Sequence, residues 1–188
     1  MAAGGGVGVR EMVARLRDAG LDAVAGDGPD LRESAAEWVE VHRAAHGLGM
    51  RTAVTMAFCA GETLEQRVEF MHVVRELQEE TGGVAAFLPM AADAPGGRDL
   101  DAATAVERLK TLAVARMFLD NVENLQAVRA GHGLKVLQTG LRFGSNDAGP
   151  VMAGRRNGTS EEDIRRVIRG AGFMPVERDA AYRVMFLV

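Results

Sequence analysis

His42 and His46 stand four residues apart, a spacing that places two imidazoles on the same face of a helix. Such a pair binds zinc in HExxH proteins, where a glutamate follows the first histidine and a further ligand completes the site. Here Arg43 follows His42, and no third ligand is evident in the sequence. We therefore expect both histidines to pack or to lie on a helix surface rather than to hold a metal.

Cys59 is the single cysteine of the chain. A thiol becomes a nucleophile when a nearby base or positive charge lowers its pKa, and nothing around Cys59 in the sequence indicates such a neighbour. One cysteine also excludes a disulfide framework, a Cys/His zinc site and a three-cysteine iron–sulfur motif built from this chain alone. We expect an inert side chain and a reducing compartment, the cytoplasm.

Two polar and glycine-containing segments remain as candidate binding sites. Gly26 and Gly28 follow a short apolar run, and glycine there would admit a phosphate or an adenosine, or would simply form a turn. Asn146 and Asp147 follow an expected helix between glycines. They would cap the next segment or line a binding-site mouth, and the residues alone leave both alternatives open.

Composition restricts the class of protein that could carry such sites. The chain has 188 residues, of which 47% are apolar and 26% are charged, as expected for one soluble domain over residues 9–188. Its 22 basic and 26 acidic residues give a net charge of −4 without a basic patch, which disfavours nucleic acid as a partner. No apolar run approaches the roughly 18 residues of a membrane span. Residues 1–8 are expected to form a flexible tail.

Apolar spacing, capping boxes and glycine stops predict helices that alternate with short apolar runs. The expected helices cover residues 9–19, 34 to 47 or 49, 63–80, 101–119, 134–143 and 160–169. The expected strands cover residues 21–25, 51–58, 84–89, 124–128 and 182–187. Four strands separated by helices indicate parallel βα units. The predicted fold is therefore α/β, a partial (βα)8 TIM-type barrel of about four units, with an additional C-terminal helix and edge strand.

Many short strings, in the same order along residues 9–183, resemble one family, the radical S-adenosylmethionine enzymes that act on futalosine and on deazaflavin precursors. Their members include dehypoxanthine futalosine cyclase, aminofutalosine synthase and the deazaflavin precursor (FO) synthase. The strings that carry the resemblance include residues 16–22, 37–46, 62–65, 77–83, 112–121, 133–136, 141–147 and 171–173.

The resemblance implies an enzyme of menaquinone biosynthesis by the futalosine pathway, with S-adenosylmethionine and a 4Fe–4S cluster as cofactors. In such enzymes the cluster binds to a CxxxCxxC loop after the first strand. This chain begins at what would be the helix before strand five, so that loop is absent, and we expect no catalytic residue and no metal ligand. The resemblance implies weak binding of S-adenosylmethionine at Gly26, Asp27, Gly28, Asp30 and Thr55.

The resemblance further implies a substrate pocket at the carboxyl ends of the strands, where parallel barrels bind their ligands. The implied pocket residues are Phe58, Glu62, Phe87, Pro89, Gln126, Asn146 and Asp147. The departures from the family pattern fall at these same strand ends. Cys59 and Ala60 replace a glycine and a histidine, and a tryptophan is missing near Val128.

Two functions are consistent with this sequence. The chain is a divergent or truncated radical S-adenosylmethionine protein that acts with a separate cluster-bearing half, or it is a non-catalytic binding module on a retained barrel scaffold. In either case a half-barrel exposes two strand edges, at residues 21–25 and 124–128, and self-association is expected unless the segment around 182–187 covers one edge.

Overall fold

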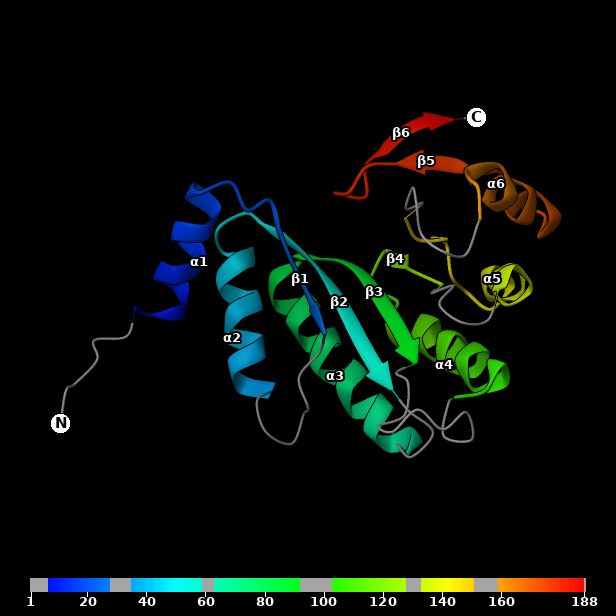
Figure 1. Cartoon of the computed structure of the whole chain (residues 1–188). Helices are drawn as coiled ribbons and strands as arrows, with labels where there is room; N and C mark the ends of the chain where they lie inside the picture. The colour runs from blue at the N-terminus through cyan, green and yellow to red at the C-terminus, as the bar shows by residue number, and fades with distance from the viewer. Residues whose placement is uncertain are drawn as a thin grey trace.

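The computed structural model describes residues 7–27, 35–58, 63–91, 103–127, 133–150 and 159–187. Most of the expected N-terminal tail lies outside these ranges, as does Ser34, the first residue of the second expected helix. Figure 1 shows the elements in space. In chain order they are α1 (Val9–Asp18), β1 (Ala23–Asp27), α2 (Ala35–His46), β2 (Arg51–Phe58), α3 (Leu64–Thr81), β3 (Val84–Ala91), α4 (Ala105–Phe118), β4 (Asn124–Leu125), α5 (Gly133–Arg142), α6 (Glu161–Gly170), β5 (Val176–Arg178) and β6 (Val184–Leu187). None of the helices in these ranges is long and apolar enough to cross a membrane.

Four strands form one parallel sheet in the order β1-β2-β3-β4. Helix α2 contacts β1 and β2, α3 contacts β2 and β3, and α4 contacts β3 and β4, so each helix crosses over between successive strands. Figure 1 shows these helices on the same side of the sheet. This arrangement confirms the predicted α/β class and is that of consecutive βα units in a partial barrel.

The sheet is buried from one side. Along β2, Val54, Met56 and Phe58 are at most 2% exposed, whereas Ala53 and Thr55 between them are half-buried and Ala57 is exposed. Successive side chains of a strand point to opposite faces, so the buried set faces the helices and the other set faces away. We call the face opposite to α2, α3 and α4 the open face.

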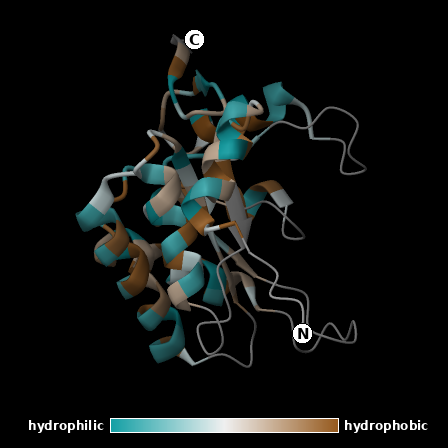
Figure 2. Cartoon of the chain, turned by 90° about the vertical axis from the view of Figure 1, so that its left-hand side faces the viewer, coloured by the Kyte–Doolittle hydropathy of each residue, from teal (hydrophilic) through white to brown (hydrophobic). Residues whose placement is uncertain are grey.

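The main core lies between the sheet and α3 and α4. It joins Phe87 and Leu125 of the sheet to Val74 of α3 and Ala115 of α4. Figure 2 shows both hydrophobic (brown) and hydrophilic (teal) stretches on the helices that it brings to the front. Burial of these side chains, at about 1.5–3 kcal/mol for each large one, is the main force that holds the helices to one face.

Side-chain caps fix where the helices begin. Thr63 forms the capping box that its sequence predicts, with Gln66 as the reciprocal partner, and the structure shows a further capping box between Ser160 and Asp163. Helix α4 begins at Ala105 rather than at residue 101, because Thr104 accepts a hydrogen bond from the amide of Glu107 and the Glu107 carboxylate accepts one from Thr104. The T-x-x-E signature at this position corrects the predicted boundary.

Strand β1 begins two residues later than predicted, so Gly26 and Asp27 lie in the strand and not in a turn after it. The cause is the end of α1. Gly20 adopts a left-handed φ of 105°, and the amide of Leu21 donates to the carbonyl of Leu16, so residues 19–21 close the helix before the strand can start.

The C-terminal strand does not join the parallel sheet. Strand β6 pairs antiparallel with β5, which the sequence reading missed, in a separate two-stranded hairpin. The edge of β4 is instead paired by Asn146 and Asp147, since the Asn146 amide donates to Leu125 and the Asp147 carbonyl accepts from Ala127. Strand β1 has a strand partner among the described residues on its β2 side alone.

The two histidines of α2 pack as predicted. His42 is 2% exposed, its ring centroid lies 3.9 Å from that of Trp38, and its Nδ1 lies 2.9 Å from the Trp38 carbonyl. His46 sits between Thr52 and Thr81, whose hydroxyl oxygens lie 2.9 and 2.6 Å from its two ring nitrogens.

The hydrogen bonds around His46 define its neutral form. The Thr81 hydroxyl donates its single proton to the Leu77 carbonyl, so it must accept from Nδ1 of His46, which leaves Nε2 to accept from Thr52. Burial, with help from His42 and Arg51, lowers the pKa of His46 to about 4. Acid therefore opposes the docking of α2 onto the β2–β3 end of the sheet.

We predict that the protein loses stability as the pH falls from 6.5 towards 4. The unfolded chain binds a proton at His46 near pH 6.5, while the folded chain resists protonation until about pH 4. The loss attributable to His46 reaches at most about 3 kcal/mol and is reduced because its ring is only half buried. Urea denaturation at several pH values measures it. His46→Gln should flatten this slope, leaving the smaller part due to His42, and an unchanged slope would contradict the assignment.

Candidate functional site

One row of register partners crosses the sheet from β1 to the segment beyond β4. Asp27 is the register partner of Thr55, and Thr55 is the partner of Leu88. Gln126 follows the pair Leu125–Phe87 and so lies level with Leu88, and it forms a parallel bridge with Asp147. We call these five positions the mid-sheet row.

The row combines hydrogen-bonding groups with space next to them. Thr55 contributes a half-buried hydroxyl and Gln126 a buried carboxamide, and the neighbouring open-face positions Ala53 and Ala57 carry only methyl groups. Small side chains allow a flat ligand to approach the sheet closely. A hydroxyl and a carboxamide suit the recognition of a polar, uncharged group such as a ribose or a nucleobase.

A polar cluster closes the β4 end of the row. Asp147 is 7% exposed, and its carboxylate accepts two hydrogen bonds from Arg178 of β5, one of 3.1 Å, and one of 2.6 Å from the Gly149 amide. The guanidinium of Arg178 lies 3.9 Å from the ring centroid of Tyr182, whose hydroxyl donates to Gln126. These contacts hold the C-terminal hairpin against the row.

Asn146 has a structural role in this arrangement. Its side-chain oxygen accepts from the Leu125 amide at 2.8 Å and from Arg116 at 3.2 Å, and its nitrogen donates to the carbonyl of Glu123. The Asn146 side chain thus joins β4 to the segment that pairs with it. Of the two predicted residues, Asp147 belongs to the mid-sheet row and Asn146 stabilises its edge.

Three predicted substrate residues lie on the other face of the sheet. Phe58 is 1% exposed, with the Arg67 guanidinium 4.5 Å from its ring centroid, and Phe87 is 0% exposed and packs against Phe70 of α3. Pro89 is buried and pairs with Met56, which also faces the helices. The period-2 alternation of β2 and β3 separates these side chains from Thr55, so their role is to form the core.

The remaining predicted positions are placed only in part. Gly26 and Asp27 are described as backbone of β1, whereas Gly28, Asp30 and Glu62 lie outside the described residues, as does Cys59. Among the residues that the structure describes, no three His, Cys, Asp or Glu side chains gather in a way that could hold a metal ion.

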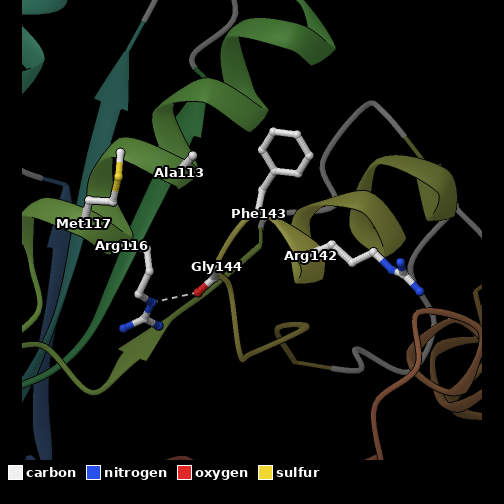
Figure 3. Close-up of a pocket in the computed structure, with 6 residues that line it drawn as sticks. All are labelled: Ala113, Arg116, Met117, Arg142, Phe143 and Gly144. Carbon is white, nitrogen blue, oxygen red and sulfur yellow. Dashed lines mark hydrogen bonds between the residues drawn. The ribbon is translucent and has the colours of Figure 1, made fainter.

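A hollow lies on the outer side of the molecule, between α4 and α5, with a volume of about 340 Å³. Figure 3 shows the six residues that line it, Ala113, Arg116, Met117, Arg142, Phe143 and Gly144. Its most buried cation, Arg116, already donates to three acceptors, the carbonyls of Gly144 and Val122 and the side chain of Asn146. This hollow is shallow and lies on the helix side, so the mid-sheet row is the better candidate site.

Arg178 and Tyr182 are site residues that the sequence reading missed. A signal was present, because Asp179 is a turn-forming residue between two short β-rich runs, residues 176–178 and 184–187. A hairpin there would have placed Arg178 and Tyr182 at the ends of its strands. Their contact with Gln126 and Asp147 is long-range and has no counterpart in local sequence.

We predict that Arg178→Ala destabilises the protein by about 2–4 kcal/mol, because it leaves the buried Asp147 carboxylate without its guanidinium partner. Arg183→Ala is the matched control on the same hairpin. Arg183 pairs with Asp179, but its side chain is 79% exposed, and loss of such a pair costs less than about 1 kcal/mol. Urea denaturation compares the two variants. Equal losses would show that the Asp147–Arg178 pair does not hold the hairpin in place.

The chain is similar in sequence to several known proteins. It is 35% identical to an aminodeoxyfutalosine synthase of Thermus thermophilus, over 93% of this chain and 54% of the relative. It is 35% identical to a cyclic dehypoxanthine futalosine synthase of Streptomyces coelicolor, over 94% of this chain and 50% of the relative. It is 34% identical to a 5-amino-6-(D-ribitylamino)uracil–L-tyrosine 4-hydroxyphenyl transferase of Methanosarcina acetivorans, over 93% of this chain and 55% of the relative.

The chain spans about half the length of these relatives. Residues 97–187 match the family described as the CofH/MqnC C-terminal region. This part of the chain contains β4, the row residues Gln126 and Asp147, and the C-terminal hairpin. The resemblance expected from the sequence is thus confirmed: the C-terminal half of the chain matches this family model, and the chain is similar to the futalosine synthases and the hydroxyphenyl transferase over more than nine-tenths of its length.

Proposed function

We propose that this chain provides the part of a radical S-adenosylmethionine enzyme that holds the adenosine side of the cofactor and the substrate, in the futalosine route to menaquinone. The observation that carries the proposal is the mid-sheet row on the open face, in a chain homologous to the synthases of that route. The proposed compartment is the cytoplasm.

The residues at hand do not fit a 4Fe–4S cluster. Such a cluster needs thiolate ligands, typically three from the protein, and the 188 residues contain one cysteine, Cys59. Within the described ranges there is also no other group of three metal-ligating side chains. We therefore assign no step of radical chemistry to these residues, and the proposed function requires cluster ligands from polypeptide other than these 188 residues.

The open face does fit the adenosine side of S-adenosylmethionine. Ligands of parallel α/β sheets bind towards the carboxyl ends of the strands, and Thr55 lies in the C-terminal half of β2. Its hydroxyl and the Gln126 carboxamide offer donors and acceptors to a ribose or an adenine. When bound, the cofactor would supply the radical chemistry, while these side chains would bind and orient it.

A partner is part of the proposal, for two reasons. The open face carries apolar side chains that remain half-buried, Leu88 and Met90, and the outer edge of β1 has no strand partner among the described residues. Unpaired backbone at a sheet edge favours addition of another strand. We propose that a cluster-bearing half, or a second copy of the chain, adds to the sheet at β1 and covers the open face.

The same two features also favour a second function, that of a non-catalytic binding module on the barrel scaffold. An open sheet edge would recruit a protein partner whether or not a cofactor binds. The two functions differ in their small-molecule ligand, since the first requires recognition of the adenosine group and the second does not.

We predict that S-adenosylhomocysteine binds the full chain weakly, with a dissociation constant in the millimolar range. Half of a pocket makes fewer contacts with the ligand, while the entropy lost on immobilising the ligand stays the same. Titration calorimetry at millimolar ligand measures it. Thr55→Val should weaken binding about 2–10-fold through loss of one hydrogen bond. Thr139→Val, at an exposed position of α5, is the matched control and should change nothing. No heat and no shift in melting temperature with the wild-type chain would remove the cofactor assignment and favour the binding module.

A further inference from the structure

Tyr182 has an unusual backbone conformation. It is the one residue other than glycine, among those described, with a positive φ, 63°. Side chains of L-residues rarely adopt this left-handed conformation, which glycine reaches without strain and asparagine tolerates. A tyrosine there indicates that its side chain does something that glycine could not do.

The turn itself does not need the tyrosine ring. Residues 179–183 connect β5 to β6, and the carboxylate of Asp179 organises them by accepting from the amides of Ala181 and Arg183 at 2.8 and 2.9 Å. The Tyr182 amide donates to the Asp179 carbonyl at 3.1 Å. Each of these hydrogen bonds uses the backbone of residues 181–183, so a glycine or an asparagine at position 182 would preserve them all.

The ring of Tyr182 connects the hairpin to the mid-sheet row. Arg178, fixed by its two hydrogen bonds to Asp147, lies over the ring with 3.9 Å between guanidinium carbon and ring centroid. The ring is thereby held with its hydroxyl 3.5 Å from Oε1 of Gln126, to which it donates. A tyrosine hydroxyl keeps its proton at neutral pH, and burial raises the pKa of the Tyr182 hydroxyl further.

This contact determines how the Gln126 carboxamide is presented. With Oε1 turned towards the tyrosine hydroxyl, the amide group Nε2 remains as the donor of the side chain. Gly149 gives it room, since a Cβ at that position would lie 3.0 Å from Nε2. Without the tyrosine hydroxyl, the carboxamide could rotate by half a turn and exchange its donor and acceptor.

We propose that Tyr182 is a positioning residue that orients the Gln126 carboxamide, so that the mid-sheet row offers N–H donors to an acceptor-bearing ligand. The ligand group is an uncharged acceptor, a ring nitrogen or a carbonyl. Tyr182 acts through Gln126, and the strain at its backbone is tolerated because Arg178 and Asp147 hold the ring. This inference rests on the proposed function, which supplies the ligand.

The test compares two variants of the full chain. Tyr182→Phe keeps the ring and its contact with Arg178 but removes the hydroxyl, and Tyr182→Asn accepts the left-handed backbone but removes the ring. Both should leave the fold intact. We expect both to change the 15N–1H resonances of the Gln126 side-chain amide, while those of Gln138 on α5, the internal control, stay the same. A merely structural tyrosine would not change the Gln126 amide when phenylalanine replaces it.

Affinity for S-adenosylhomocysteine provides the second readout. Tyr182→Phe should weaken binding about 3–10-fold, as expected for one hydrogen bond, and Gln126→Ala should cause little further loss in the Tyr182→Phe background, because the two residues act as one unit. Independent, additive losses, or an unchanged Gln126 amide in Tyr182→Phe, would overturn the inference. If the wild-type chain binds no S-adenosylhomocysteine, the proposed function fails, and the amide resonances still decide whether Tyr182 positions Gln126.

Discussion

The arrangement of this protein depends on one constraint, the burial of its parallel sheet from a single side. Residues such as Val54 and Phe87 reach 0% exposure because α3 and α4 cover the face to which they point. Once that face is buried, the period-2 geometry of a strand forces Thr55 and Leu88 onto the other face. A register shift of one residue would exchange the two sets, so the same apolar contacts that stabilise the fold also determine which side chains can meet a ligand.

The C-terminal hairpin turns this open face into a defined site at one end. The chain segment at Asn146 and Asp147 pairs with β4, and the Asp147–Arg178 ion pair then holds the hairpin in place. A buried carboxylate tolerates its environment only when paired and hydrogen-bonded, and Asp147 satisfies this condition with Arg178 and the Gly149 amide. At the opposite end, β1 presents an edge to which the proposed partner adds.

The sequence predicted the elements well where local signals are strong. The capping box at Thr63 and the β-rich run in residues 51–58 led to a correct helix and to a correct central strand. Boundaries failed where a signal was overlooked, as at Thr104, or where the end of one helix displaced the next strand, as at Gly20.

The site residues were harder to predict, because a position near the carboxyl end of a strand does not determine to which face of the sheet the side chain points. Phe58, Phe87 and Pro89 stand next to Thr55 and Gln126 in sequence or register, but they point into the core. Successive side chains of a strand point to opposite faces, so correct strand positions would have been enough to separate the core residues from Thr55 and Gln126. The role of Tyr182 could not be foreseen, since it depends on a contact with Gln126 across 56 positions of sequence.

Mapping of the ligand site by nuclear magnetic resonance tests the central claim most directly. Backbone amide shifts of the full chain, followed during titration with S-adenosylhomocysteine, report which residues meet the ligand. We expect the largest changes at Thr55, Leu88 and Gln126 in the mid-sheet row, with small changes along α4 and α5. Changes confined to the hollow around Met117 and Phe143 between those helices would contradict it.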